Sequence, residues 1–264
     1  MKENFFSHVP ESSLKSFGIF RNNKKVTYVD IEKLADLLSK KIRINEINVI
    51  GIISSNTLES AMNYFAIKKI GLVPVIIPID DVVDGIDYLK EIGCTKFLCS
   101  KIELQAFNIK IKNYFKIVNV YENTDLFLIN DKEHLSDIKM EGDIILTSGT
   151  SGKKKGVFIS NRSIISSVNY ISSIMDINCT YKEFLGVPFF HSFGLARLRM
   201  SIFHGSKIYI PQNNTDLAEA LHLIKSYKPN IASFVPASIE MFHKFFSKKI
   251  KSELSSLEKI ELGS

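Results

Sequence analysis

Residues 144–157 read IILTSGTSGKKKGV, an apolar run that passes directly into hydroxyls, glycines and lysines. The run Asp143 to Thr147 is typical of a buried strand. The polar part holds what a phosphate group needs: hydroxyl donors, positive charge, and two glycines, Gly149 and Gly152, that let backbone N–H groups approach an anion. The sequence therefore predicts a strand that ends in a phosphate-binding loop.

This loop does not match the Walker loop. That motif requires Gly, four residues, and then Gly-Lys-Ser/Thr opening a helix. Here Gly149 and Gly152 are only three positions apart, and no Ser or Thr follows the lysines. A polar surface turn that happens to contain Ser, Thr and Gly is the alternative, and the strand directly before the loop favours the phosphate site.

Short apolar runs alternate with amphipathic segments along the chain, which is typical of a parallel sheet covered by helices. We expect strands at 49–53, 73–79, 96–99, 117–120, 126–129, 143–147, 184–187, 207–210, 231–235 and 257–262. We expect helices at 58–70, 84–92, 162–175, 194–204, 215–227 and 237–246. Gly71 and Gly93 stand just past two of these helices, where helices commonly end. We expect a subdomain boundary near Glu141.

The segment 147–157 resembles the AMP-binding signature of the adenylate-forming superfamily, which contains acyl-CoA synthetases, nonribosomal peptide adenylation domains and luciferases. Family members usually carry proline where this chain has Lys154, and Lys155 stands where the family has its basic residue. Further matching segments follow in the family's order: 26–28 with a helix-like 31–41, 58–78, 160–163, 188–194, 229–242 and 256–263. The resemblance implies an α/β fold, with parallel β-sheets flanked by helices as in the amino-terminal domain of these enzymes, incomplete at the carboxy end.

The resemblance also implies ATP-dependent activation of a carboxylic acid as its acyl-adenylate, followed by transfer to a thiol of coenzyme A or of phosphopantetheine on a carrier protein. The implied cofactors are ATP and Mg²⁺. The implied nucleotide-binding residues are Thr147, Ser148, Gly149, Thr150, Ser151, Gly152, Lys153 and Lys155. Thr150 and Lys155 are expected to be catalytic by stabilising charge on the phosphates, and Thr150 is also expected at the metal ion.

The expected substrate pocket consists of His191, Phe190, Phe234 and Pro236. From the residues alone, a single histidine among phenylalanines is more often a core residue. The resemblance instead implies that His191 lies on the substrate-facing wall, without a general-base role. Residues 233–235 lack the Asp that adenylation domains carry for amino-acid substrates, which favours a fatty, aryl or other non-amino acid.

The composition is that of an ordinary globular chain, with 264 residues of which 45% are hydrophobic. Lys and Arg number 34 against 28 Asp and Glu, but no nucleic-acid module accompanies this excess, so we expect no nucleic-acid partner. The three cysteines lack the spacing of a zinc site. No apolar stretch reaches the ~20 residues of a membrane span, and residues 1–13 lack the apolar core of a signal peptide, so we expect a cytoplasmic protein.

The family segments that contact adenine, ribose and the α-phosphate would lie beyond Gly263 and do not occur in this chain. We therefore expect a partial amino-terminal AMP-binding domain over 1–264, without the small carboxy-terminal domain and with an exposed sheet edge. Besides the acid, the expected partners are an acyl carrier protein and a complementing carboxy-terminal chain. Three interpretations stay open: the amino-terminal part or one half of a split acid:thiol ligase, a non-catalytic binding or assembly protein of the same fold, and an unrelated phosphate-binding enzyme such as a kinase.

Overall fold

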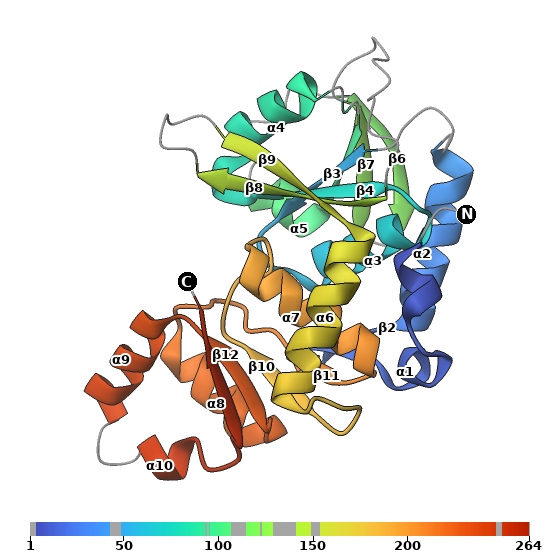
Figure 1. Ribbon diagram of the computed structural model, residues 1–264. Coiled ribbons are helices and arrows are strands. Elements are labelled where there is room, and N and C mark those ends of the chain that lie inside the picture. Colours follow the sequence, from blue (N-terminus) through green and yellow to red (C-terminus); the bar gives the residue numbers. More distant parts are fainter. Residues whose placement is uncertain are drawn as a thin grey trace. The chain divides into compact units, whose positions relative to one another are not determined.

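The computed structural model describes residues 4–42, 49–92, 94, 96–106, 115–121, 123–128, 141–148, 154–246 and 250–263. The chain divides into two compact units, and each of them is discontinuous in sequence. The first unit comprises residues 1–8 and 29–166, and the second comprises 9–28 and 167–264. Each unit contains one β-sheet with helices packed on it (Figure 1). The boundary expected near Glu141 stays a prediction.

The first unit is built on a seven-stranded sheet with the order β6-β7-β5-β3-β4-β8-β9. Its strands are β3 (Val49–Ser54), β4 (Val73–Pro78), β5 (Lys96–Ser100), β6 (Phe115–Tyr121), β7 (Thr124–Leu128), β8 (Gly142–Ser148) and β9 (Lys154–Ser160). The central strands β5, β3, β4 and β8 are parallel. Antiparallel pairing joins β7 to β5, β6 to β7 and β9 to β8, so the sheet is mixed at both edges.

Helices cover both faces of this sheet (Figure 1). The helices of this unit are α2 (Tyr28–Lys41), α3 (Leu58–Lys69), α4 (Val82–Glu91) and α5 (Lys101–Ala106), with short 3₁₀ helices η1 (Phe5–His8) and η2 (Ile79–Asp81), and α3, α4 and α5 contact the strands. On the first unit's buried helix α3, Thr57 and Ser60 form a capping box at the start. Gly71, with φ +76°, follows its end, which confirms the expected stop. Gly93 lies outside the described residues.

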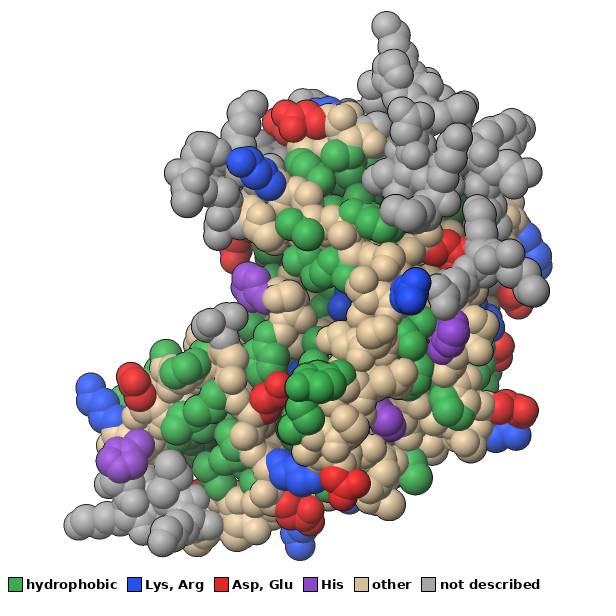
Figure 2. Space-filling view, in the orientation of Figure 1, with side chains coloured by type: hydrophobic (Ala, Val, Ile, Leu, Met, Phe, Trp, Pro, Cys, Tyr) green, Lys and Arg blue, Asp and Glu red, His purple; other side chains and the backbone are tan. Residues whose placement is uncertain are grey.

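The second unit is built on a six-stranded sheet with the order β13-β12-β10-β11-β1-β2. Its strands are β1 (Gly18–Arg21), β2 (Lys24–Thr27), β10 (Lys182–Leu185), β11 (Lys207–Tyr209), β12 (Ile231–Phe234) and β13 (Lys259–Leu262). All neighbouring strands are parallel except the β1–β2 hairpin. At the β13 edge, Ile260 and Leu262 are 46% and 52% exposed, and Figure 2 shows hydrophobic side chains gathered on the surface of this unit.

The helices of the second unit are α1 (Glu11–Ser16), α7 (Ser192–His204), α8 (Leu217–Tyr227), α9 (Pro236–Phe246) and α10 (Ile250–Glu253); α6 (Asn161–Met175) begins in the first unit and ends in the second. Residues of β10, β12, α8 and α9 form one apolar core: Phe184, Ala220, Leu221, Leu223, Ile224, Ala232, Phe234 and Phe242. Gly205 ends α7 with φ +68°, and a Cβ there would lie 2.1 Å from Ser16 Oγ. Only glycine therefore fits between α7 and α1.

The expected α/β class with sheets flanked by helices is confirmed, but two of the expectations need correction. The sheets are not purely parallel, because both carry antiparallel edge strands. No strand is expected between the polar loop and the helix at 162–175, but β9 lies there and pairs along the whole of β8. Among the helices that the structure describes, none combines the length and apolar character needed to cross a membrane.

Candidate nucleotide-binding hairpin and substrate-pocket segments

The predicted phosphate loop joins two paired strands. The register of β8 and β9 runs from Gly142 opposite Ser160 to Ser148 opposite Lys154. At the loop end, Thr147 lies opposite Lys155, and Thr147 Oγ1 donates a hydrogen bond to Lys155 O over 3.2 Å. Both side chains are exposed. A threonine and a lysine are thus opposite each other on neighbouring strands in the sequence-predicted site.

The five residues at the tip of the hairpin are not described. Of the expected nucleotide-binding residues, Gly149, Thr150, Ser151, Gly152 and Lys153 lie outside the described residues. Ser148 is placed as the last residue of β8. The roles expected for Thr150, catalytic and metal-binding, therefore stay predictions.

Gly156, next to Lys155, lies under an aromatic ring. A Cβ on Gly156 would be 1.8 Å from the Tyr88 hydroxyl oxygen and 2.7 Å from Ile144 Cγ2. Burial raises the pKa of Tyr88, and a hydrogen bond with the Gly156 backbone opposes that rise. The glycine of the KKKGV run thus allows Tyr88 of α4 to pack directly on β9.

A buried polar network lies at the other end of the hairpin. Lys68 Nζ of α3 is 2.7 Å from Asp143 Oδ1 and 3.2 Å from Gly142 O, and it also donates to Asn161 Oδ1. The Tyr64 hydroxyl donates to Asp143 Oδ2 over 2.6 Å. The side chains of Lys68 and Asp143 are each 1% exposed. One ammonium group therefore contacts the start of β8 and Asn161, the residue of α6 that directly follows β9.

In the second unit, the expected pocket residues Phe190 and His191 lie in the segment between β10 and α7. Their rings are in edge contact with centroids 4.7 Å apart. Phe190 is half-buried, and His191 is exposed at the N-cap of α7. A Cβ on Gly194 would be 2.3 Å from Pro188 O, so the first turn of α7 packs tightly against this segment.

The other two expected pocket residues, Phe234 and Pro236, differ in their surroundings. Phe234 is 1% exposed, and its ring is packed in the core between Phe184 and Phe242, with centroid distances of 5.5 Å to each. Pro236 opens α9 and is exposed. The backbone links these segments to β13, because Gly263 N donates to Phe234 O over 3.2 Å.

Gly263 also contacts the helix that begins at the His191 segment. A Cβ on Gly263 would be 2.7 Å from Phe193 Cδ1. The end of β13, the end of β12 and the first turn of α7 therefore meet around this glycine. The structure brings together the backbones of the expected pocket segments, while the ring of Phe234 points into the core.

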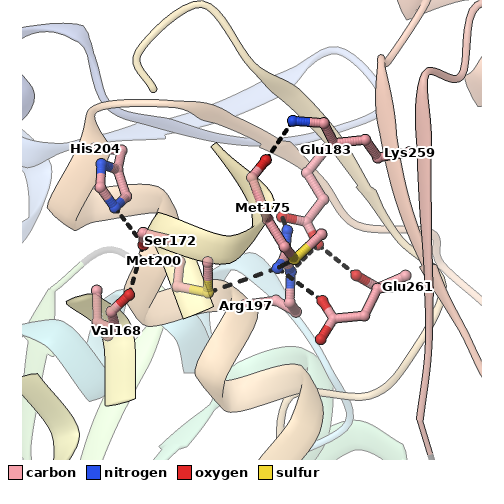
Figure 3. A network of polar contacts seen from close by, with 10 residues as sticks. Val168, Ser172, Met175, Glu183, Arg197, Met200, His204, Lys259 and Glu261 are labelled. Atoms are coloured by element: carbon pink, nitrogen blue, oxygen red, sulfur yellow. Dashed lines mark hydrogen bonds and ion pairs between the residues drawn. The ribbon is translucent and has the colours of Figure 1, made fainter. Parts of the chain in front are cut away.

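A charged network that the sequence did not predict connects the strands β10, β12 and β13 (Figure 3). Arg197 of α7 binds Glu183 of β10 with two hydrogen bonds, Nε to Oε1 over 2.7 Å and Nη2 to Oε2 over 2.8 Å. Its Nη1 is 2.7 Å from Oε2 of Glu261 in β13. Ser233 of β12 donates to Glu183 Oε1 over 2.6 Å. The fully buried guanidinium thus contacts two strands directly and a third through Glu183.

Burial and charge act in opposite directions on the pKa values of this network. Burial would lower the pKa of Arg197, but the carboxylates of Glu183 and Glu261 outweigh it and raise that pKa. Burial raises the pKa of Glu261, and the charge of Glu183 adds to this, against the opposing effect of Arg197. The arginine stays charged and holds both carboxylates.

The described ranges contain no cluster of metal-ligating side chains, and two of the three cysteines are buried. Within them, no group of three or more His, Cys, Asp or Glu side chains could hold a metal ion. Cys94 and Cys99 are buried and Cys179 is exposed. Burial raises the pKa of the Cys94 thiol to about 11, so it stays protonated and unreactive near neutral pH.

Known proteins show the same fold and related sequences. Tyrocidine synthase 2 of Brevibacillus parabrevis is 24% identical over 96% of this chain and 7% of its own length. The 4-coumarate–CoA ligase-like protein 3 of Arabidopsis thaliana is 23% identical over 98% of this chain and 51% of its own length. The O-succinylbenzoate coenzyme A synthetase of Bacillus subtilis, solved with ATP and magnesium ion, superposes with a TM-score of 0.73 at 17% identity, over 100% of this chain and 55% of that one.

Two sheets flanked by helices, with a hydroxyl- and lysine-bearing hairpin at the edge of one sheet, define the amino-terminal fold of adenylate-forming enzymes. The chain belongs to the AMP-binding enzyme family, whose model matches residues 14–264. This confirms the resemblance and sets aside an unrelated phosphate-binding enzyme such as a kinase. The chain spans about half the length of the ligase-like relative and of the solved synthetase, and a far smaller share of the tyrocidine synthase.

Proposed function

We propose that this chain is the amino-terminal part of a ligase that activates a carboxylic acid with ATP and Mg²⁺ and passes the acyl group to a thiol. The observation that carries the proposal is the β8–β9 hairpin. It presents Thr147 beside Lys155 at the end of a loop of hydroxyls, glycines and lysines, within a chain that matches the AMP-binding family over nearly its whole length.

The proposed reaction has two steps. A carboxylate oxygen attacks the α-phosphorus of ATP, which forms the acyl-adenylate and releases pyrophosphate. A thiol sulfur then attacks the acyl carbon, its proton is lost, and AMP leaves. The protein's contribution is to position the reactants and to stabilise phosphate charge, so no nucleophilic side chain is needed.

The proposed roles follow from the positions in the hairpin. Thr147, Ser148 and the loop 149–153 would donate hydrogen bonds to the β- and γ-phosphates, and Lys155 would supply positive charge. Mg²⁺, held by phosphate oxygens and Thr150, would neutralise charge as pyrophosphate leaves. Fixed donors and a cation at this point stabilise the transition state because they need no reorganisation during the reaction.

The proposed substrate is an acid that carries no amino group to be recognised. Residues 233–235 contain no Asp that could bind a substrate amino group. The one hydroxyl among them, on Ser233, is buried and donates to Glu183, so it is engaged within the protein. The surroundings of Phe190 and His191 favour an apolar or aromatic acyl group. The acceptor is a thiol of coenzyme A or of a carrier protein.

The test is ATP–pyrophosphate exchange with a panel of aryl, fatty and amino acids, on protein purified from its own cells. We expect exchange with at least one non-amino acid. Lys155→Ala should lower its rate by about 10²-fold or more. Lys207→Ala, which removes an exposed lysine from β11, is the matched control and should leave the rate unchanged. MgATP binding without exchange for any acid would favour a non-catalytic binding protein instead.

A further inference from the structure

We propose that Lys68 is a positioning residue of the nucleotide site. From α3 it fixes the base of the β8–β9 hairpin, and thereby the direction in which the hairpin presents Thr147 and Lys155. This inference rests on the proposed function, because it gives those two residues a role at the phosphates. Lys68 itself touches no substrate.

The contacts of Lys68 are placed on both sides of the hairpin. Gly142 and Asp143 are the first two residues of β8, and Asn161 directly follows Ser160, the last residue of β9. Since Gly142 lies opposite Ser160 in the register, the ammonium group binds the point where the two strands meet the rest of the unit.

The hydrogen bonds of this network are complete. An ammonium group has three N–H donors, and Lys68 has three oxygen acceptors on Gly142, Asp143 and Asn161. The second carboxylate oxygen of Asp143 accepts from Tyr64. Asn161 is tied further, because its backbone N–H donates to Glu141 O over 3.1 Å. A satisfied buried network of this kind specifies one geometry, since every bond is lost if the strands turn.

Stability alone does not account for a buried ion pair at this position. Replacing such a pair by neutral side chains of similar size is often neutral or stabilising, because both charges escape the cost of desolvation. We infer that the pair instead serves to fix the orientation of the hairpin. Tyr88 packs on β9 at Gly156, towards the loop, whereas the Lys68 network acts at the opposite end of the hairpin.

The double variant Lys68→Met/Asp143→Asn separates geometry from stability. It removes both charges, retains the approximate lengths of the side chains, and leaves an amide oxygen for Tyr64. Lys69→Met is the matched control, because Lys69 is the next residue of α3 but makes a partly exposed ion pair with Glu32 at 3.1 Å.

Two measurements are made on folded protein in the form in which it occurs in its own cells: amide hydrogen exchange in 142–148 and 154–160, with 49–54 as the internal reference, and MgATP affinity by calorimetry. We expect exchange in the hairpin to become about tenfold faster in the double variant, with no change in the reference, and MgATP affinity to fall about tenfold. Lys69→Met should change neither.

The outcomes are distinguishable. A folded double variant with unchanged exchange and unchanged affinity overturns the positioning role. Faster exchange in the hairpin, together with no MgATP binding by the unaltered protein, overturns the proposed function of the hairpin and the nucleotide role of Lys68 with it. If the double variant does not fold, Asn161→Ala removes the contact on the β9 side alone. It should accelerate exchange in 154–160 more than in 142–148, and equal exchange in both would overturn the inference.

Discussion

At the residue scale, His204 links stability to pH. Its Nε2 is 2.6 Å from Ser172 Oγ, which itself donates to Val168 O over 2.6 Å, so the histidine donates to the serine (Figure 3). Burial, and secondarily the charge of Arg197, lower the pKa of His204 below its ordinary 6.5. The unfolded chain therefore binds a proton that the folded protein rejects.

We accordingly expect the free energy of unfolding to fall as the pH falls from above 6.5 through the lower pKa of folded His204. Urea unfolding at pH 7.5 and 5.5 measures this difference. His204→Gln retains a donor for Ser172 but cannot titrate, so it should reduce the difference. A pH dependence of the same size in the variant would assign the effect to other groups.

Arg197 is a second residue whose removal has a definite cost. Arg197→Met leaves the carboxylates of Glu183 and Glu261 without their buried cation, and breaking such a network typically costs about 3–5 kcal/mol. Urea unfolding of the variant checks this value. Arg197→Met/Glu183→Gln should recover part of the loss, because the more buried charge is then also gone. Failure to recover any of it would mean that the packing of the arginine stem dominates.

At the element scale, β9 depends on a residue without a side chain. Gly156→Ala places a methyl group 1.8 Å from the Tyr88 hydroxyl oxygen, and overpacking of this kind costs about 1–3 kcal/mol. Thermal unfolding measures the loss. Tyr88→Leu introduced into the same variant should relieve part of the loss, since the tyrosine hydroxyl is gone while Ile144 Cγ2 still lies 2.7 Å from the added carbon. A loss of equal size with leucine would mean that Ile144, and not Tyr88, resists the methyl group.

The start of α8 offers an independent test of a local rule. Asp216 is the N-cap and accepts hydrogen bonds from Ala218 N over 2.9 Å and Glu219 N over 3.0 Å. Asp216→Ala should lower the free energy of unfolding by about 1 kcal/mol, whereas Asp216→Asn keeps the cap and should stay within a few tenths. An equal loss in both variants would show that the charge matters rather than the capping oxygen.

The elements differ in how well the sequence predicts them. The buried strands β3, β4 and β12 are continuous apolar runs, and they lie within a residue or so of the expected bounds. In β9, lysines and Gly156 interrupt the apolar pattern, because this edge strand exposes Lys155 and Val157. The four-residue strands β1 and β2 are too short to establish a period of two.

The candidate site is predictable where a local motif carries it. Thr147 and Lys155 follow from one contiguous segment, whereas Lys68 and Asp143 are 75 residues apart and meet only because α3 packs on the sheet at β4, the neighbour of β8. Arg197 and Glu261 are likewise distant in the sequence and meet only in the folded unit. The available signal was a charged residue inside an apolar segment: Lys68 in a helix buried on nearly every side, and Asp143 at the head of a buried strand.

At the scale of the whole molecule, the second unit depends on residues from near the amino terminus. Ile19 of β1 is fully buried, and β1 pairs with β11 about 190 residues later. Ile19→Ala should cost about 2–4 kcal/mol. Hydrogen exchange should accelerate in 182–185 and 207–209 and remain slow in 49–54 and 73–78, because each unit has its own sheet and core. Equal acceleration in both units would show that they open together.

The length of the β8–β9 hairpin turns a small rotation at its base into a larger displacement at its loop end. β8 has seven residues, of which the first two, Gly142 and Asp143, belong to the Lys68 network and the last, Ser148, adjoins the loop. At a rise of about 3.3 Å per residue, β8 is about 20 Å long. If β8 tilts by about 3° at its start, its loop end moves by about 1 Å. A misplacement of about 1 Å in an active site can lower the rate about 10²-fold. The angular tolerance of a phosphate site at the loop end is therefore set in part at the base of the hairpin, where a single buried ammonium group bonds to the start of β8 and to Asn161, directly after β9.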